Sequence, residues 1–120
     1  MYKKEQLDTC LSMLKRCGVI DASAIVTTEG LLIASDIFKG TDPAVFAAMS
    51  ATMMGAAETA LIELRKGHVN RFIVETSTGR LIAIGAGSTA VLVVLTGPEA
   101  PLGTVLLEMG RSASRIQEIL

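Results

Sequence analysis

Residues 81–98 form an uncharged segment that approaches the length of a membrane span. Glycine, serine, threonine and proline residues interrupt it, so the uninterrupted apolar pieces are only 81–84 and 90–95. Pieces of this length are typical of strands, since a helix that crosses a bilayer needs about 20 apolar residues. The second piece contains VLVVL, which has no polar–apolar alternation. It therefore predicts a central strand that is covered on both faces of a sheet.

The remaining patterns predict helices on both sides of that sheet. Apolar residues repeat at helical spacing over 3–17, and Asp42-Pro43 is a strong start signal for a second helix. The charges of Arg71 and Glu75 suit an edge strand. The sequence thus predicts one α/β sandwich domain over residues 1–120. The expected elements are helix 3–17, strands 22–28 and 31–36, helix 43–66, strands 71–76, 80–85 and 89–96, and a last helix from residue 102.

Composition limits the partners of this chain. Eleven basic residues against twelve acidic ones leave a net charge of −1, so there is no basic excess for nucleic-acid binding. Half of the residues are hydrophobic, only 19% are charged, and the mean hydropathy is +0.51. Self-association would cover the apolar surface that so few charges leave. The N-terminal MYKKEQLD has no apolar signal region, so we expect a cytoplasmic protein without membrane insertion.

Motifs for nucleotide chemistry are weak. The sequence has no G-x-x-x-x-G-K-[ST] motif, so the chain is not itself a P-loop GTPase or ATPase. Residues 85–90 read G-x-G-x-x-A, but a strand follows them, whereas a dinucleotide site needs a helix there. The segment is interpreted as a hairpin turn, and no cofactor is expected.

Catalytic and metal-ligating residues are also sparse. His68 is the only histidine, it follows the predicted second helix, and the acidic residues are dispersed. Cys10 and Cys17 lie seven positions apart on one predicted helix, about 10 Å along its axis, which is too far for a disulfide. We expect both thiols to be small apolar side chains. The sequence predicts no enzyme, no catalytic residue and no metal site.

The helix over 43–66 is unusually apolar on its outer side. Residues 43–57 carry no charge, and Gly55 lowers helix propensity by roughly 1 kcal/mol relative to alanine. A smooth strip of small residues favours contact with a helix of another chain, and an alanine-rich exposed helix is the alternative. The helical wheel predicts the sheet-facing side as Val45, Phe46, Met49, Met53, Ala56, Ala57, Ala60, Leu61 and Leu64, and the opposite side as Ala47, Ala48, Ala51, Gly55 and Ile62, flanked by Thr52, Thr59 and Glu58.

Taken together, the hairpin SAIVTTEGLLIASD, the segment FIVETSTGRLIAIGAG and the C-terminal VLVVLTGPEAPLGTVLLEMGRSASRIQEIL resemble the roadblock family. That family includes dynein light chains and small-GTPase regulators, and the resemblance covers residues 4–120. It implies a profilin-like, three-layer α/β/α sandwich with a five-stranded mixed sheet in the order 2-1-5-4-3. The first and third helices would cover one face and the second helix the other.

The resemblance also implies a homodimer that joins two third strands into a ten-stranded sheet and pairs the second helices. It further implies a non-enzymatic module that regulates or scaffolds a Ras-like small GTPase, whose identity the sequence leaves open. A structural adaptor in a motor or motility complex is the alternative, and fold analogy alone suggests a small-molecule sensor. The expected dimer interface comprises Ala47, Ala48, Ala51, Thr52, Gly55, Glu58, Thr59, Ile62, Arg71, Phe72, Ile73, Val74 and Glu75.

Overall fold

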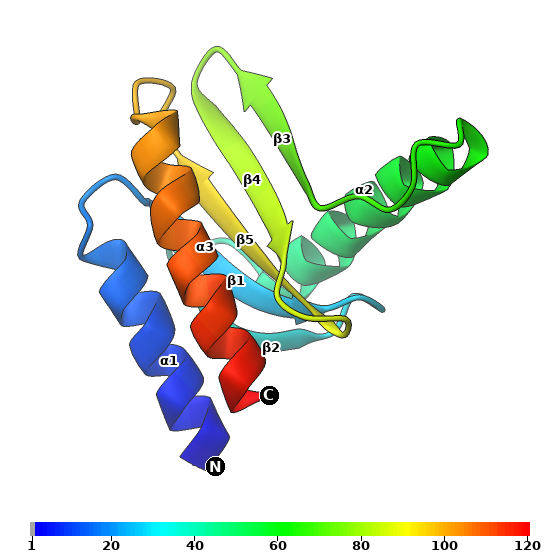
Figure 1. Cartoon of the computed structure of the whole chain (residues 1–120). Coiled ribbons are helices and arrows are strands. Elements are labelled where there is room, and N and C mark those ends of the chain that lie inside the picture. Colours follow the sequence, from blue (N-terminus) through cyan, green and yellow to red (C-terminus); the bar gives the residue numbers. More distant parts are fainter. Residues whose placement is uncertain (1) are drawn as a thin grey trace.

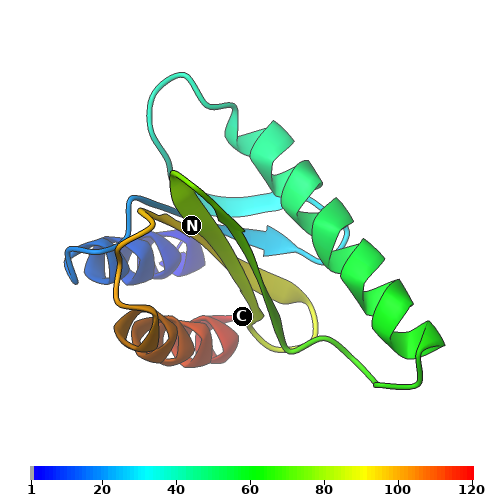
Figure 2. The same cartoon turned by 90° about the horizontal axis from the view of Figure 1, so that it is seen from above.

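The computed structural model, which describes residues 2–120, has three layers (Figures 1 and 2). Helices α1 (Tyr2–Lys15) and α3 (Leu102–Ile119) lie side by side on one face of a sheet, and α2 (Pro43–Glu63) lies on the other face. The strands are β1 (Ala22–Thr27), β2 (Leu32–Asp36), β3 (Arg71–Thr76), β4 (Gly79–Gly85) and β5 (Ala90–Thr96).

The sheet has the order β2-β1-β5-β4-β3, which confirms the predicted order. All four neighbouring pairs are antiparallel, so the expectation of a mixed sheet is wrong. Tight turns join β1 to β2 and link β3, β4 and β5 in a meander, and such turns require antiparallel neighbours. The one pairing between segments distant in sequence, β1 with β5, is antiparallel as well.

Two hydrophobic clusters hold the layers together. The larger one lies between the sheet and the α1/α3 pair, and it includes Leu11, Leu92 and Met109. The smaller one lies beneath the N-terminal half of α2 and includes Phe46 and Val93. Strand β5 contributes to both clusters, which confirms that it is the central strand covered on both faces.

Helix α2 begins as its sequence predicts and ends earlier. The Asp42 carboxylate accepts a hydrogen bond of 3.0 Å from the Ala44 amide, and Pro43 follows at the first helical position. The helix stops at Glu63 rather than at residue 66, because Arg65 adopts a left-handed conformation with φ of 60°. That conformation cannot continue a right-handed helix.

The turn between β1 and β2 lies against α2. Gly30 has a φ of 98°, and a Cβ atom placed on it would be 3.4 Å from the Ala51 Cβ and 3.5 Å from the Ala48 Cα. Glycine therefore serves both the turn and the close approach of the helix. This contact and the smaller hydrophobic cluster hold only the first half of α2. Its C-terminal end leans away from the sheet and extends beyond β3 (Figures 1 and 2).

Candidate functional site

Strand β3 forms one edge of the sheet, as the charges of Arg71 and Glu75 predicted. It pairs with β4 along its whole length, whereas the helices pack on β1, β2, β4 and β5. Its apolar side chains are consequently accessible: Ile73 is 36% exposed and Val74 is 41% exposed. This edge is a surface on which another strand can pair.

The backbone of β3 presents a regular set of hydrogen-bonding groups to solvent. Asn70 is opposite Gly85, and its carbonyl accepts a 3.3 Å hydrogen bond from the Gly85 amide, so its polar groups point towards β4. The direction alternates along an antiparallel strand. The N–H and C=O groups of Arg71, Ile73 and Glu75 therefore point to the open edge.

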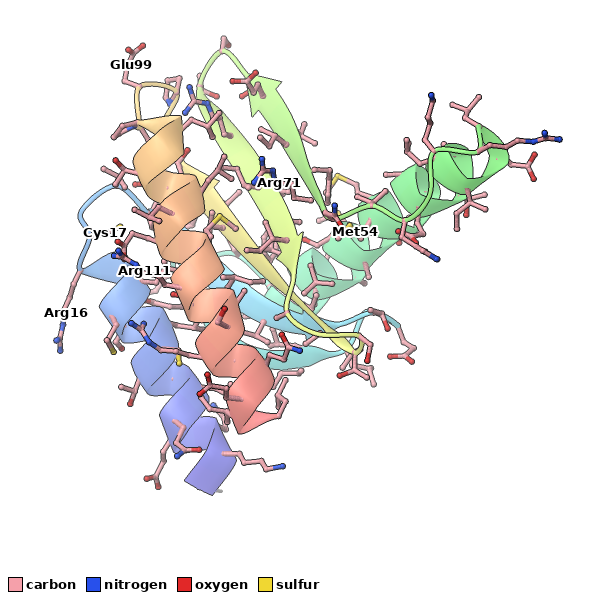
Figure 3. The ribbon with its side chains drawn as sticks, viewed as in Figure 1. Arg16, Cys17, Met54, Arg71, Glu99 and Arg111 are labelled. Carbon is pink, nitrogen blue, oxygen red and sulfur yellow. The ribbon has the colours of Figure 1, made fainter. Side chains whose placement is uncertain are left out.

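The side chains of β3 alternate between the two faces of the sheet. Ile73 is opposite Ile82, which belongs to the cluster beneath α1 and α3. Ile73 thus lies on the α3 side, together with Arg71 and Glu75. Phe72 packs against the cluster beneath α2 and is half-buried, and Val74 shares its face. Figure 3 marks Arg71 at the start of β3.

The face that α2 turns to the sheet differs from the predicted one. Phe46, Ala47 and Ser50 are buried against the sheet, whereas Val45 and Met49 are 51% and 54% exposed. The prediction was wrong for Ala47, whose side chain is fully buried in its own chain, and for the exposed residues Val45, Met49, Ala56, Ala60 and Leu64. The helix is rotated about its axis relative to the predicted orientation, so the side that carries Phe46, Ala47 and Ser50 meets the sheet. Val45 and Met49 therefore lie on the outer face of α2. The only sequence signal for a contact at these two positions was that their side chains are large and apolar.

The other candidate residues occupy two groups. On α2, Ala48, Thr52, Gly55, Thr59 and Ile62 are exposed, while Ala51 and Glu58 are half-buried. On β3, Arg71, Ile73, Val74 and Glu75 are exposed, and Phe72 is half-buried. With the exception of Ala47, each candidate thus retains surface that a second molecule can contact.

Gly55 has no structural role within its own chain. A Cβ atom placed on it would meet nothing within 4 Å, and its φ is not in the left-handed region. Alanine would therefore fit and would raise the helix propensity by roughly 1 kcal/mol. The sequence predicted that a helix of another chain approaches closely here, and the open space around Gly55 leaves room for such a contact.

Glu58 fixes the connection between α2 and β3. One of its carboxylate oxygens accepts a hydrogen bond of 2.5 Å from His68 Nδ1, and the other accepts one of 2.9 Å from the Val69 amide. The Val69 amide, and then the His68 contact, hold the pKa of Glu58 below its ordinary value. Glu58 thus acts within its own chain, and no sequence pattern indicated this contact. His68 is a polar residue after the helix, as predicted.

Grooves lie near β3 on both faces of the sheet. One, of about 600 Å³, lies between the second half of α2 and the β4–β5 turn and is lined by Met54, Val69 and Gly87 among others. Another, of about 660 Å³, lies between α3 and the β3–β4 pair, with Arg71 and Gln117 on its walls. Within residues 2–120, no three histidine, cysteine, aspartate or glutamate side chains gather as a metal site requires.

The remaining predicted motifs have structural explanations. Residues 85–90 join β4 to β5, with Gly87 at a φ of 81°, so the glycine-rich segment is a hairpin turn. Cys10 is buried and Cys17 is half-buried, and neither forms a disulfide. Burial raises the pKa of the Cys10 thiol, which disfavours the reactive thiolate.

Among residues 2–120, α2 is the one helix whose length and apolar composition would allow it to span a bilayer. Little of it is buried in the molecule. Apolar surface of this extent on a small protein marks a contact with another macromolecule or with lipid.

Comparison with known proteins identifies the fold family. The sequence profile described as Roadblock/LC7 domain matches residues 7–96. The chain belongs to this family. An uncharacterized protein of Methanocaldococcus jannaschii, MJ0310, is 32% identical to this Roadblock/LC7 chain over 111 residues, which cover 92% of it and 96% of MJ0310.

Solved structures agree with this assignment. The gliding protein MglB of Thermus thermophilus is 18% identical, with a TM-score of 0.87, and the match covers 99% of this chain and 91% of MglB. Profilin IA of Acanthamoeba castellanii is 16% identical, with a TM-score of 0.62 and 96% of each chain covered. At these identities the structural matches show a shared fold.

Proposed function

We propose that the chain is a cytoplasmic, homodimeric binding module without enzymatic activity, which regulates or scaffolds a Ras-like small GTPase. The observation that carries this proposal is an open β3 edge beside an apolar, overhanging α2 in a Roadblock/LC7 domain. The edge and the helix together form a surface for protein contacts, and the family resemblance supplies the type of partner.

Dimerisation would cover both the open edge of β3 and the exposed face of α2. Pairing of two β3 strands about a twofold axis satisfies their outward backbone groups. The second half of each α2, which extends past β3, would then lie over the partner's bare sheet face around Phe72, Val74 and Leu81. Burial of several hundred Å² of apolar surface per subunit gives a gross hydrophobic contribution above ~10 kcal/mol. Association entropy offsets a comparable part, so a stable but reversible dimer is expected.

The nucleotide in this proposal belongs to the partner. The chain has no P-loop motif, and its glycine-rich segment is a hairpin turn. An effect on GTP hydrolysis would therefore arise by repositioning of the switch loops of the GTPase. Calorimetry of the chain alone with GTP, GDP, ATP and NAD should show no binding at tens of micromolar, and stoichiometric binding of any of them would contradict the proposal.

A capture experiment followed by a turnover assay tests the regulatory role. Tagged protein is used to isolate partners from the native cell, and mass spectrometry identifies those that contain G-x-x-x-x-G-K-[ST]. We expect such a partner, and its rate of GTP hydrolysis should change when the wild-type chain is added. The Ile73→Lys variant, which is designed to be monomeric, should have a much smaller effect at the same concentration.

A structural adaptor role is the second candidate. It is favoured by the fold shared with MglB of T. thermophilus, whose description is that of a gliding protein. A complex with a GTPase whose turnover rate stays the same would support the adaptor role over the regulatory one. Cell fractionation tests the location, since we expect the chain in the soluble fraction, and recovery with the membranes would indicate that lipid covers α2.

A further inference from the structure

The charges of β3 are symmetric about its central apolar residue. Arg71 and Glu75 lie two positions before and after Ile73, and all three side chains share one face of the sheet. We propose that two copies of the chain pair their β3 strands about a twofold axis at Ile73, so that Arg71 of each copy lies opposite Glu75 of the other. This inference rests on the proposed homodimer and specifies its register.

The direction of the backbone groups favours this register. Residues directly opposite each other in an antiparallel pair lie on the same face of the sheet. The two α2 helices therefore share a face only if one residue of β3 lies opposite its own copy in the partner, because a shift by one residue turns the partner over. An axis at Ile73 brings the outward groups of Arg71, Ile73 and Glu75 into hydrogen-bonded pairs with Glu75, Ile73 and Arg71 of the partner. An axis at Phe72 or Val74 pairs only two of these three residues within β3.

Charge complementarity favours the same register. The Arg71 guanidinium forms no ion pair with a carboxylate in residues 2–120. Glu75 accepts a 3.0 Å hydrogen bond from Arg80 Nε on β4, and its side chain is 63% exposed, so the carboxylate stays accessible from the open edge. The register at Ile73 places the partner's Arg71 at that edge. Each half of the joined sheet then contains a row of Arg80, Glu75 and the partner's Arg71, and opposite charges on directly opposed residues stabilise a strand pair.

Cysteine cross-linking measures the register directly. In a Cys10→Ala/Cys17→Ser background, Ile73→Cys would place two thiols on opposed residues with Cα atoms about 5.5 Å apart, within disulfide range. Val74→Cys is the matched control, because its two copies would be diagonal neighbours about 7–8 Å apart. Under mild oxidation we expect a covalent dimer with Ile73→Cys and little with Val74→Cys. Efficient cross-linking at Val74→Cys or Phe72→Cys instead would overturn the register.

Charge reversal supplies a test that does not depend on cysteine. Arg71→Glu places two glutamates opposite each other, and Glu75→Arg places two arginines, so each variant alone should dissociate at least about tenfold more readily. A mixture of the two variants restores both pairs, so heterodimers should exceed the statistical half in native mass spectrometry. A statistical mixture would contradict the pairing of Arg71 with Glu75.

The failures of the two proposals are distinguishable. Light scattering of the wild type at micromolar concentration reports the dimer, independently of its register. A monomeric wild type overturns the homodimer and this inference together. A dimeric wild type without a preference for Ile73→Cys leaves the homodimer standing and rejects the register.

Discussion

The two edges of the sheet are built differently. Strand β2 is short, a bulge lies between Ile25 and Val26 in its pairing with β1, and both α1 and α2 pack on it. Its last residue, Asp36, forms a 3.4 Å ion pair with Lys15 of α1. Strand β3 is regularly paired with β4, and it carries accessible apolar residues on both faces of the sheet.

This difference favours β3 as the edge that pairs with another chain. Short length, irregular pairing and covering helices are the means by which proteins protect an edge strand from other chains. Strand β2 has the irregular pairing and the covering helices, whereas β3, which is only one residue longer, has neither and carries charges that a second copy can complement. The β2 edge is thus covered more fully than the β3 edge, which is the edge that the proposed homodimer pairs.

The largest expected effect comes from lysine substitutions at matched positions on the two edges. Ile73 and Leu32 are 36% and 37% exposed, so Ile73→Lys and Leu32→Lys should cost the isolated subunit similar amounts. Only Ile73→Lys would place two charges opposite each other in the dimer. Together with the lost apolar contact this costs about 4 kcal/mol, or a roughly thousandfold higher Kd. Light scattering over a concentration series measures it, and equal behaviour of the two variants would remove the distinction between the edges.

A second comparison uses two helical glycines. A Cβ atom placed on Gly55 of α2 or Gly110 of α3 would meet nothing within 4 Å, so neither Gly55→Glu nor Gly110→Glu should disturb the subunit. Gly55→Glu should weaken the dimer by about 3 kcal/mol, or roughly a hundredfold in Kd, because it places an unpaired charge between helices. An unchanged dimer in Gly55→Glu would move the interface away from α2.

A smaller effect is expected on the inner side of α2. The Ser50 hydroxyl is buried, and within residues 2–120 no hydrogen-bond partner reaches it. Ser50→Ala should therefore raise the free energy of unfolding by about 1 kcal/mol. The Kd of the dimer should not change, because Ser50 faces its own sheet. Chemical denaturation measures the first quantity, and a less stable Ser50→Ala variant would show that the hydroxyl is satisfied.

The smallest effect concerns the contact of Glu58 with the α2–β3 connection. Its pKa in the folded chain is lowered, so the stabilisation is complete above the pKa of the unfolded chain, about 4.3, and is lost as pH falls through the folded value. Glu58→Gln keeps one acceptor oxygen and loses the other, so the variant is less stable at neutral pH, but it removes this pH dependence. Melting temperatures measured between pH 3 and 6, roughly the range of this titration, should fall less steeply for Glu58→Gln than for the exposed control Glu63→Gln.

Much of the fold follows from local sequence patterns. The run VLVVL predicted the central strand, Asp42-Pro43 predicted the start of α2, and Arg71 with Glu75 predicted the edge strand. These signals act over a few residues, because strand alternation and helix capping are local effects. The homodimer and its interface stay predictions.

The errors concern the orientation of α2 about its own axis. Ala47 was placed outside and Val45 and Met49 inside, because the broad apolar side of the wheel was taken as the side that faces the sheet. The helix turns the neighbouring side with Phe46, Ala47 and Ser50 to the sheet, and that choice depends on packing with strands distant in sequence. The contact between Glu58 and His68 joins residues ten positions apart around an irregular turn, so no periodic pattern could reveal it.

The pairing of β1 with β5 has a consequence for the order in which the chain is synthesised. Strand β1 pairs with β5 through registers such as Ala22 with Leu95, so the central ladder joins segments from opposite ends of the sequence. During synthesis on the ribosome, the β1–β2 hairpin emerges before the meander of β3, β4 and β5. Until β5 is made, the side of β1 that pairs with it has no neighbouring strand. When β5 emerges, β1 is already present to cover it. Strand β5, most of whose residues are buried, thus has partners for both of its edges, β1 and β4, as soon as it emerges.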